Sequence, residues 1–149
     1  MISKVDTSCN VLLDPGSKPG VTNKKNKVPH LTKQRKLGNT GEKLAAAYLK
    51  SEGFKICAVN FSTKLGEIDI IAQKYDFISF IEVKTRKKEH FAVSQVVTKS
   101  KQQKIIKTAK LYTMRHKIKN KVLRFDIITV IGSQDDHKIN HIKNAFYGQ

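Results

Sequence analysis

Cysteine is scarce in this 149-residue sequence, which also has no tryptophan and only three prolines. The two cysteines, Cys9 and Cys57, are too few for a disulfide framework and lack the CxxC spacing of a zinc site. Cys57 stands in an apolar segment, which favours a buried thiol. No apolar run approaches the roughly 18 residues of a membrane-spanning helix, and the run at 11–13 is too short for a secretory signal. We therefore expect a cytoplasmic protein without a membrane-spanning segment.

Acidic residues are also few. Twelve Asp and Glu stand against 29 Lys and Arg, which gives a formal net charge of +17 at pH 7. Such an excess favours a polyanionic partner, and nucleic acid is the usual one, although an acidic membrane surface would fit the charge too. The alternative is a charge excess that only keeps the protein in solution, for which +17 is large.

The sequence changes character near residue 36. All three prolines lie before that point, among Gly, Ser, Asn and Lys, and basic residues outnumber acidic ones there. We expect residues 1–36 to form a basic, disordered N-terminal arm and residues 37–149 to form one folded domain. The arm either adds non-specific contacts to phosphate groups or is a simple tail.

Hydrophobic patterning after the arm predicts an α/β domain. The expected elements are a helix at 40–52, strands near 54–60, at 66–72, at 77–84 and at 123–131, and a helix from 100 to about 116. Gly53 would end the first helix, and residues 73–76 would join two strands as a hairpin loop. Ser100 and Gln103 form a candidate capping box for the second helix. This order predicts a mixed sheet with helices packed on it.

Acidic residues interrupt the predicted strands. The four in question are Glu67, Asp69, Glu82 and Asp126. An unpaired carboxylate is costly in apolar surroundings, so each must be solvated, paired or bound to a metal. Arg124 precedes Asp126 by two residues on the same strand face, and this spacing predicts an ion pair.

Strand periodicity places the other three acids relative to one another. Glu67 and Asp69 share one face of their strand, and Glu82 and Lys84 share one face of the next. A four-residue loop at 73–76 would set Glu67 opposite Glu82. Asp69 would then be a diagonal neighbour of Glu82, roughly 7–8 Å away along the backbone. A slip of one residue would separate the two pairs to opposite faces.

Two carboxylates in this arrangement suit a divalent cation. Mg²⁺ takes oxygen ligands and typically binds one or two carboxylates together with a substrate phosphate. Lys84, two residues beyond Glu82, would assist a water molecule or stabilise negative charge on the phosphate. The alternative is a solvent-exposed strand face on which Asp69, Glu82 and Lys84 form ordinary cross-strand ion pairs.

Other polar residues have a structural interpretation. Glu42 falls in the first turn of the predicted helix at 40–52, where a carboxylate interacts favourably with the helix dipole, and Asn39 would be the N-cap. The five histidines show no zinc or catalytic-triad spacing, so we assign no role to His137 and His141 in the C-terminal segment.

Two segments together resemble a known family. Residues 66–72 read GEIDIIA and residues 80–86 read FIEVKTR. They resemble the YraN-like family of predicted endonucleases, a distant relative of the archaeal Holliday-junction resolvases within the PD-(D/E)xK nuclease superfamily. The similarity covers about residues 37–131. Further matching positions, in the same order, are Gly41, Glu42, Ala45, Tyr48, Leu49, Gly53, Phe54, Asn60, Phe61, Gln95, Val96, Lys104, Ala109, Arg124, Phe125 and Asp126.

The resemblance implies a fold and a site. It implies a three-layer α/β/α, restriction-endonuclease-like core around a mixed central sheet, with Asp69 and Glu82 as metal ligands and Lys84 as the catalytic lysine. It adds Glu42 as a third metal ligand, because related resolvases use a glutamate of the first helix. Gln95 falls where many members of the superfamily place a supporting polar residue, and Glu67, which shares a strand face with Asp69, would be a second supporting residue.

We therefore expect a Mg²⁺- or Mn²⁺-dependent endonuclease that cuts DNA of branched or repair-related structure. A homodimer is expected by analogy with resolvases, and no membrane partner is expected. The alternative is a non-catalytic, basic nucleic-acid-binding module that uses the same fold and charge. The residues expected to contact nucleic acid are Lys64, Arg86, Lys87, Lys99 and Lys104.

Overall fold

The computed structural model describes residues 33–87 and 97–147 of the chain, and it describes side chains from residue 40 onward. The N-terminal arm lies outside this range up to residue 32. The elements are α1 (Lys33–Ser51), β1 (Lys55–Thr63), β2 (Gly66–Lys74), β3 (Phe77–Arg86), α3 (Lys99–Arg115), β4 (Val122–Gly132) and β5 (His137–Phe146). Within the described residues, no helix is long and apolar enough to cross a membrane.

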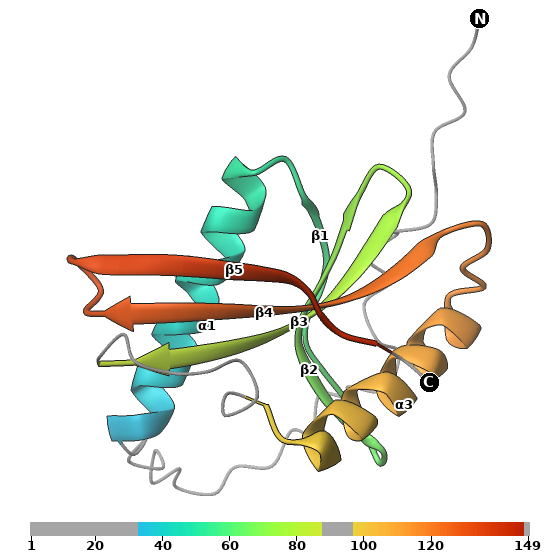
Figure 1. Cartoon of the computed structure of the whole chain (residues 1–149), viewed down its shortest axis with the longest axis horizontal. Helices are drawn as coiled ribbons and strands as arrows, with labels where there is room; N and C mark the ends of the chain where they lie inside the picture. The colour runs from blue at the N-terminus through green and yellow to red at the C-terminus, as the bar shows by residue number, and fades with distance from the viewer. Residues whose placement is uncertain (1–32, 88–96, 148–149) are drawn as a thin grey trace, which may run out of the picture.

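The strands form one five-stranded sheet in the order β1-β2-β3-β4-β5. Neighbouring strands are antiparallel except for β3 and β4, which run parallel because α3 connects them. The expected mixed sheet of an α/β protein is therefore confirmed. The sheet twists strongly, so that β1 and β2 cross the direction of β4 and β5, and α1 passes behind the last three strands (Figure 1).

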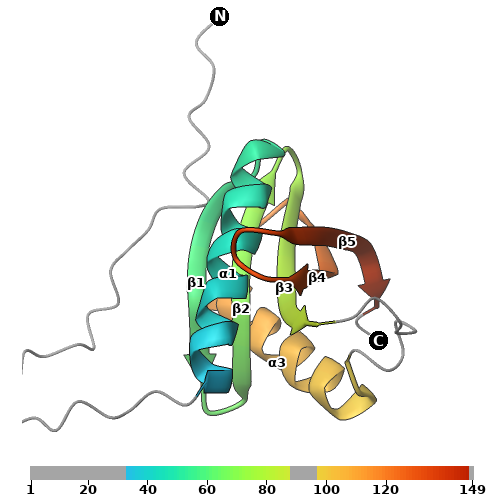
Figure 2. The same cartoon turned by 90° about the vertical axis from the view of Figure 1, so that its left-hand side faces the viewer.

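The hydrophobic core is divided between the two helices. Ile70 and Ala72 of β2 pack in a cluster with Ala45 and Leu49 of α1. Ile71, which lies between them in sequence, belongs instead to a cluster that includes side chains of α3. Because successive strand residues point to opposite faces, the two helices cover opposite faces of the sheet. Figure 2 shows the sheet from the side on which α1 lies.

Helix α1 begins earlier than predicted. It starts at Lys33 rather than near residue 40, so Asn39 lies within the helix and is not its N-cap. Its end agrees with the prediction, since Gly53 takes a left-handed φ of 81°. The Gly53 N–H donates to Lys50 O and the Phe54 N–H donates to Leu49 O, which is the Schellman arrangement that closes a helix.

The cap of α3 also differs from the prediction. Thr98, not Ser100, is the N-cap, and its side-chain oxygen accepts a hydrogen bond from the Lys101 N–H at 3.3 Å. A threonine oxygen satisfies an otherwise unpaired amide of the first turn, so no Ser100–Gln103 capping box is needed. The buried residues of α3 are Ile105, Ile106, Thr108, Ala109 and Tyr112.

The hairpin between β2 and β3 is tighter than predicted. Lys74 pairs with Phe77, which leaves only Tyr75 and Asp76 in the turn. Tyr75 adopts a left-handed φ of 51°, a conformation suited to a two-residue hairpin. The expected four-residue loop at 73–76 is therefore wrong, and the pairing of the two strands is displaced by two residues.

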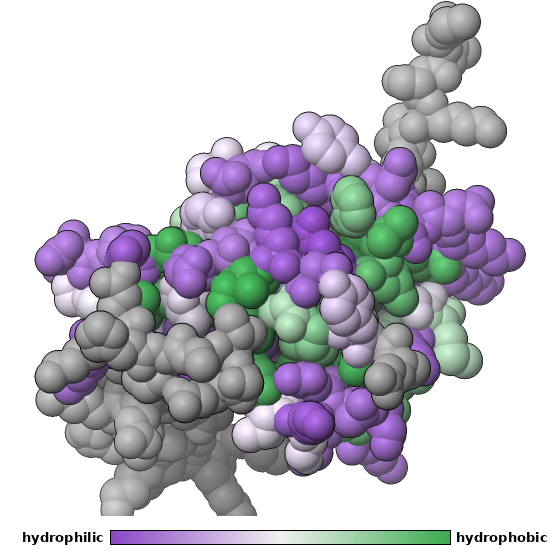
Figure 3. All heavy atoms as spheres, in the orientation of Figure 1, coloured by the Kyte–Doolittle hydropathy of each residue, from purple (hydrophilic) through white to green (hydrophobic). Residues whose placement is uncertain are grey.

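The last strand, β5, was not predicted. Its sequence, HKINHIKNAF, mixes polar and apolar residues, and most of its positions are exposed or half-buried because it lies at the edge of the sheet. Its polar and apolar residues do not alternate regularly, so it lacks the pattern by which the other strands were predicted. On the face drawn in Figure 3 the surface is largely hydrophilic, with hydrophobic residues gathered towards the middle.

Cys57 is buried in β1, where it belongs to the cluster on the α3 side of the sheet, so the expected burial of this residue is confirmed.

Candidate active site

Asp69 and Glu82 meet where β2 and β3 begin to separate. The paired register of the two strands ends at Ile70 and Ile81. One step further along this register, Asp69 stands opposite Glu82, rather than diagonal to it as the longer loop would require. A displacement of two residues keeps every side chain on its face, so the predicted grouping of Asp69, Glu82 and Lys84 survives the error in the turn. Figure 1 shows the two strands diverging, and we call this place the fork.

Asp69 is a buried carboxyl group with little to neutralise it. It is 9% exposed and accepts a hydrogen bond from the Val83 N–H at 2.7 Å. Burial, and next the charge of Glu82, raise the pKa of Asp69 to about 7, and Glu42 adds to this effect. The Val83 N–H and Lys101 act in the opposite direction but do not compensate. A carboxyl group in this state favours a bound cation or proton.

Glu82 is more deeply buried than Asp69 and has two lysine partners. It is 1% exposed, and its Oε1 accepts a hydrogen bond from Lys84 Nζ at 2.6 Å. Its Oε2 lies 3.3 Å from Lys101 Nζ, which is within ion-pair range. The geometry of that second contact does not make a hydrogen bond, and Oε2 has no hydrogen-bond partner among the described residues. One oxygen of Glu82 therefore has an ion-pair partner but no hydrogen bond.

Lys101 was missed from the sequence. It comes from the first turn of α3, and it precedes Ile105, Thr108 and Tyr112 by four, seven and eleven residues. This spacing places Lys101 on the buried stripe of the helix. Lys101 could have been identified from the sequence by this position, because an ammonium group on a core-facing stripe needs a partner.

Glu42 is half-buried near the middle of α1, not in its first turn. The helix-dipole interpretation is therefore wrong, because that effect is confined to the terminal turns. The charge of Glu42 raises the pKa of Asp69, which places the two acids within electrostatic reach. Beside Glu42, Gly41 packs so closely on Thr85 of β3 that an added Cβ would collide with its hydroxyl oxygen. The small residue thus brings α1 down onto the strand that carries Glu82.

The two expected supporting residues do not join the pair. Glu67 is exposed and pairs with Ser62 of β1, so its expected position opposite Glu82 is wrong. The displaced register is the reason, because it shifts Glu67 along β3 by two residues from its predicted position opposite Glu82. Gln95 lies outside the described residues.

The expected nucleic-acid contacts lie at the ends of elements. Lys64 is exposed in the turn between β1 and β2, and Lys87 is exposed immediately after β3. Lys99 and Lys104 are exposed on the first two turns of α3, and the Lys104 side chain packs beside Gly66 at the start of β2. Arg86 is half-buried at the end of β3, where its guanidinium donates to Thr85 O.

A second buried acid lies on the α1 side of the sheet. Asp126 is fully buried and accepts hydrogen bonds from Arg124 in a two-pronged contact, which confirms the predicted ion pair. It also contacts His141 Nε2 at 2.9 Å and accepts from the Asn144 N–H at 2.9 Å. Burial alone would raise the pKa of Asp126, but these three partners hold it below its usual value. This carboxylate is fully compensated.

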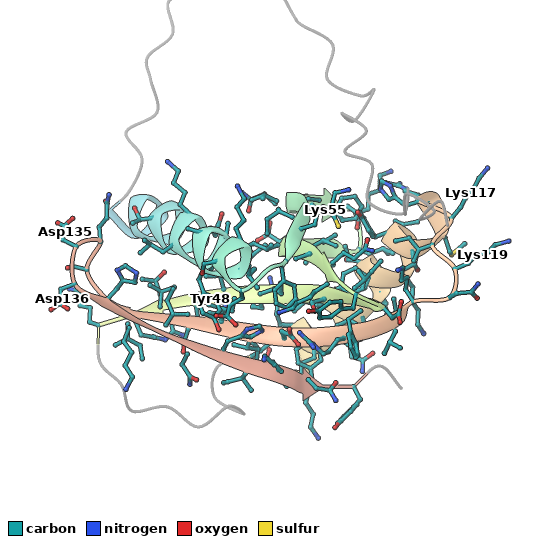
Figure 4. The ribbon with its side chains drawn as sticks, turned by 90° about the horizontal axis from the view of Figure 1, so that it is seen from above. Tyr48, Lys55, Lys117, Lys119, Asp135 and Asp136 are labelled. Carbon is teal, nitrogen blue, oxygen red and sulfur yellow. The ribbon has the colours of Figure 1, made fainter. Side chains whose placement is uncertain are left out.

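His141, to which no role was assigned, is therefore a structural residue. Its ring makes an edge contact with Tyr48 of α1 and also lies near Phe54. Figure 4 shows Tyr48 on the sheet side of its helix, with Lys117 and Lys119 at the opposite end of the sheet from Asp135 and Asp136. Little in the sequence indicated this role, because β5 itself was not predicted.

The donor set at the fork can be tested against a divalent cation. Among residues 33–87 and 97–147, no group of three or more His, Cys, Asp or Glu side chains is arranged to hold a metal ion. Asp69 and Glu82 nevertheless fit one, since they are two buried carboxyl groups whose mutual repulsion a cation would relieve. Oε2 of Glu82, which has no hydrogen-bond partner among the described residues, is the oxygen that would ligate the cation once Lys101 moves away.

Comparison with known proteins gives one consistent result. Residues 41–130 match a family described as "Uncharacterised protein family UPF0102". A UPF0102 protein of Clostridium botulinum strain Loch Maree is 48% identical over 114 residues, covering 74% of this chain and 93% of that protein. A UPF0102 protein of Caldanaerobacter subterraneus subsp. tengcongensis is 44% identical over 117 residues, covering 76% of this chain and 96% of that protein. A third, from Caldicellulosiruptor saccharolyticus, is 42% identical over 116 residues, covering 76% and 98%.

The matched region contains every element of the fork, from Glu42 to Lys101, together with Asp126. The names of these relatives state no activity. The length of the match and the level of identity show that the chain belongs to the UPF0102 family, the YraN-like family that its GEID and EVK segments resemble.

Proposed function

We propose that this chain is a metal-dependent endonuclease that hydrolyses phosphodiester bonds in DNA. The observation that carries the proposal is the meeting of two buried carboxyl groups, Asp69 and Glu82, with Lys84 bonded to one of them, at the fork between β2 and β3. Burying such a cluster costs folding free energy, and clusters of this kind occur preferentially at functional sites. The mixed sheet with a helix on each face is compatible with a restriction-endonuclease-like core.

The acid pair would hold Mg²⁺ or Mn²⁺. Asp69 and Glu82 offer the carboxylate oxygens that these cations prefer, and Glu42 is the candidate third ligand. A divalent cation bound there supplies Lewis-acid polarisation of a phosphate oxygen. Cation binding would also stabilise the protein electrostatically, because it would remove the repulsion from Glu82 that helps to raise the pKa of Asp69.

Lys84 would act on the phosphate and on the attacking water. Its Nζ is held 2.6 Å from Glu82 Oε1, and about a quarter of the side chain remains exposed at the edge of the acid pair. An ammonium group fixed there stabilises negative charge as it develops on the phosphate, and it orients a water molecule through its remaining donors.

The substrate proposal rests on charge. Exposed lysines, among them Lys64, Lys87, Lys99 and Lys104, lie on the elements that border the fork, and the whole chain carries a net charge of +17. Contacts of this kind bind the phosphate backbone without regard to sequence. Branched or repair-related DNA is the proposed target, and a homodimer would allow two symmetric cuts.

A cleavage assay tests the proposal. Plasmid, single-stranded and four-way-junction DNA would each be incubated with the wild type, Asp69→Asn and Lys84→Met, in Mg²⁺, Mn²⁺ or chelator. We expect cutting that requires metal and falls at least about a hundredfold in both variants. Asp76→Asn is the matched control, since Asp76 is an exposed acid in the turn that closes the other end of the β2–β3 hairpin. Cutting that persists in both site variants would overturn the proposal.

One observation favours a second function. Lys84 and Lys101 already neutralise Glu82 without a metal, as they would in a non-catalytic, basic nucleic-acid-binding module. That module would bind DNA with a strong salt dependence and cut none of it. Equal binding by the wild type, Asp69→Asn and Lys84→Met, without cutting under any metal condition, would identify it.

A further inference from the structure

The two lysines on Glu82 are held in different ways. Lys84 comes from the same strand as Glu82, and its Nζ makes a 2.6 Å hydrogen bond to Oε1. Lys101 comes from α3, and its Nζ lies 3.3 Å from Oε2 without hydrogen-bond geometry. The Lys84 contact is therefore short and local, whereas the Lys101 contact joins two separate elements and is loose.

The Lys101 contact involves Oε2 of Glu82, which is the oxygen at which a divalent cation would bind. Oε2 of Glu82 is buried and has no hydrogen-bond partner among the described residues. Lys101 Nζ is the positive charge that stands before it, on a side chain that is 29% exposed. A lysine side chain has four rotatable carbon–carbon bonds, so its ammonium group can leave this contact when another cation takes its place at Oε2. Lys101 therefore occupies the electrostatic place of a metal through an ion pair that has no hydrogen bond.

A bound nucleic-acid backbone would offer the Lys101 ammonium group another partner. Lys99 and Lys104 are exposed on the first two turns of the same helix, and the backbone of Lys101 is fixed there by the Thr98 cap. A nucleic-acid backbone drawn to Lys99 and Lys104 would bring phosphate oxygens within reach of Lys101. The phosphate would then compete with Glu82 for the Lys101 charge.

We propose that Lys101 is an exchangeable counter-cation, which blocks metal binding at Glu82 Oε2 in the free protein and transfers to a backbone phosphate when DNA binds. This inference rests on the proposed function, because it assumes that the fork binds a divalent cation and that its substrate carries phosphates. Its consequence is a coupling between the two ligands. DNA tightens metal binding by removing Lys101 from Glu82, and the metal tightens DNA binding by the same factor.

The measurement is Mn²⁺ affinity, followed by the electron paramagnetic resonance signal of free Mn²⁺. Without DNA, Lys101→Gln should bind Mn²⁺ more tightly than the wild type, within the range of about 5- to 150-fold that is typical of coupled sites. Lys101→Arg keeps the charge and should stay close to the wild type. Lys107→Gln, at an exposed lysine further along the same helix, is the matched control and should not change the affinity.

The second arm adds a short DNA duplex whose phosphorothioate linkages resist cleavage. It should tighten Mn²⁺ binding by the wild type but leave Lys101→Gln unchanged, because that variant has no ammonium group to transfer. Asp69→Asn should lose the Mn²⁺ site and thereby identify the signal as binding at the fork. Circular dichroism of each variant checks that α3 remains folded.

The outcomes separate this inference from the nuclease proposal. If Lys101→Gln binds Mn²⁺ with unchanged or weaker affinity, the exchange is wrong even where the wild type cuts DNA. If the affinities change as expected and no DNA is cut, the exchange stands and the nuclease proposal fails. If neither protein binds Mn²⁺ at millimolar concentration, both are wrong.

Discussion

Asp69 and Asp126 are both buried aspartates in apolar strands of the same sheet, yet their surroundings differ in kind. Asp126 accepts hydrogen bonds from Arg124 and Asn144 N–H and contacts His141, and these partners lower its pKa in spite of burial. Asp69 accepts a backbone hydrogen bond from Val83 but faces another acid, Glu82, and its pKa rises to about 7. Asp126 has partners enough for a carboxylate, whereas both lysines of the fork contact Glu82 and leave Asp69 with a single backbone donor.

The difference separates a structural acid from a candidate functional one. A compensated carboxylate ties elements together, as Asp126 does for β4 and β5. An uncompensated carboxylate such as Asp69 weakens the fold unless a proton or a cation joins it. The following three experiments test this contrast, from the largest expected effect to the smallest.

Asp126→Asn should destabilise the protein severely. The substitution leaves the Arg124 guanidinium without its anion in a largely buried position, and breaking a buried ion pair from one side costs about 3–5 kcal/mol. The free energy of unfolding, measured with urea, should fall by that amount. Asp76→Asn is the control, because its carboxylate is 84% exposed and its contact with Lys121 is a surface ion pair, whose loss costs under about 1 kcal/mol. Similar losses for both variants would contradict the contrast.

Asp69 should make the protein less stable as the pH rises. Its folded pKa of about 7 lies above the usual 3.8, so the folded state holds this proton more strongly than the unfolded state does. Stability is therefore greatest below pH 4 with respect to this group, and it declines between pH 4 and 7, by at most roughly 4 kcal/mol.

Urea unfolding of the wild type and of Asp69→Asn at several pH values measures this decline. The difference in unfolding free energy between the two should shift in favour of the variant as the pH rises from 4 to 7. Asp126 has the opposite sign, since its lowered pKa contributes stability that is lost only as the pH falls below about 4. A constant difference between wild type and Asp69→Asn across this range would mean that Asp69 is compensated after all.

Gly41→Ala tests whether α1 belongs to the acid cluster. In most helices this change stabilises by up to about 1 kcal/mol. Here the new Cβ would collide with Thr85 and lift the helix from β3, so we expect a loss of about 1–3 kcal/mol. Thermal unfolding measures it, with the exposed Ala47→Ser as the control. Mn²⁺ affinity should also weaken if Glu42 contributes to the site, and a stabilised variant would show that the close approach is unimportant.

Local pattern predicted the strands and helices well where burial alternates clearly. It located the cores of β1 to β4 and of α3, and the end of α1 at Gly53, because Gly and apolar periodicity act over a few residues. It failed at β5, an edge strand with mixed polarity, and at the start of α1. It also failed at the turn before β3, where Tyr75 takes a left-handed conformation that its residue type does not announce.

The sequence alone determined that Asp69 lies on one strand face and that Glu82 and Lys84 share a face of the next. The pleat of a strand fixes this alternation, and it survives any even displacement of register. Only the tertiary structure decided which charges surround each acid. Lys101 reaches Glu82 from α3, and His141 reaches Asp126 from β5. Those contacts join segments far apart in the chain, and they depend on how helices and an edge strand pack on the sheet, which no local pattern contains.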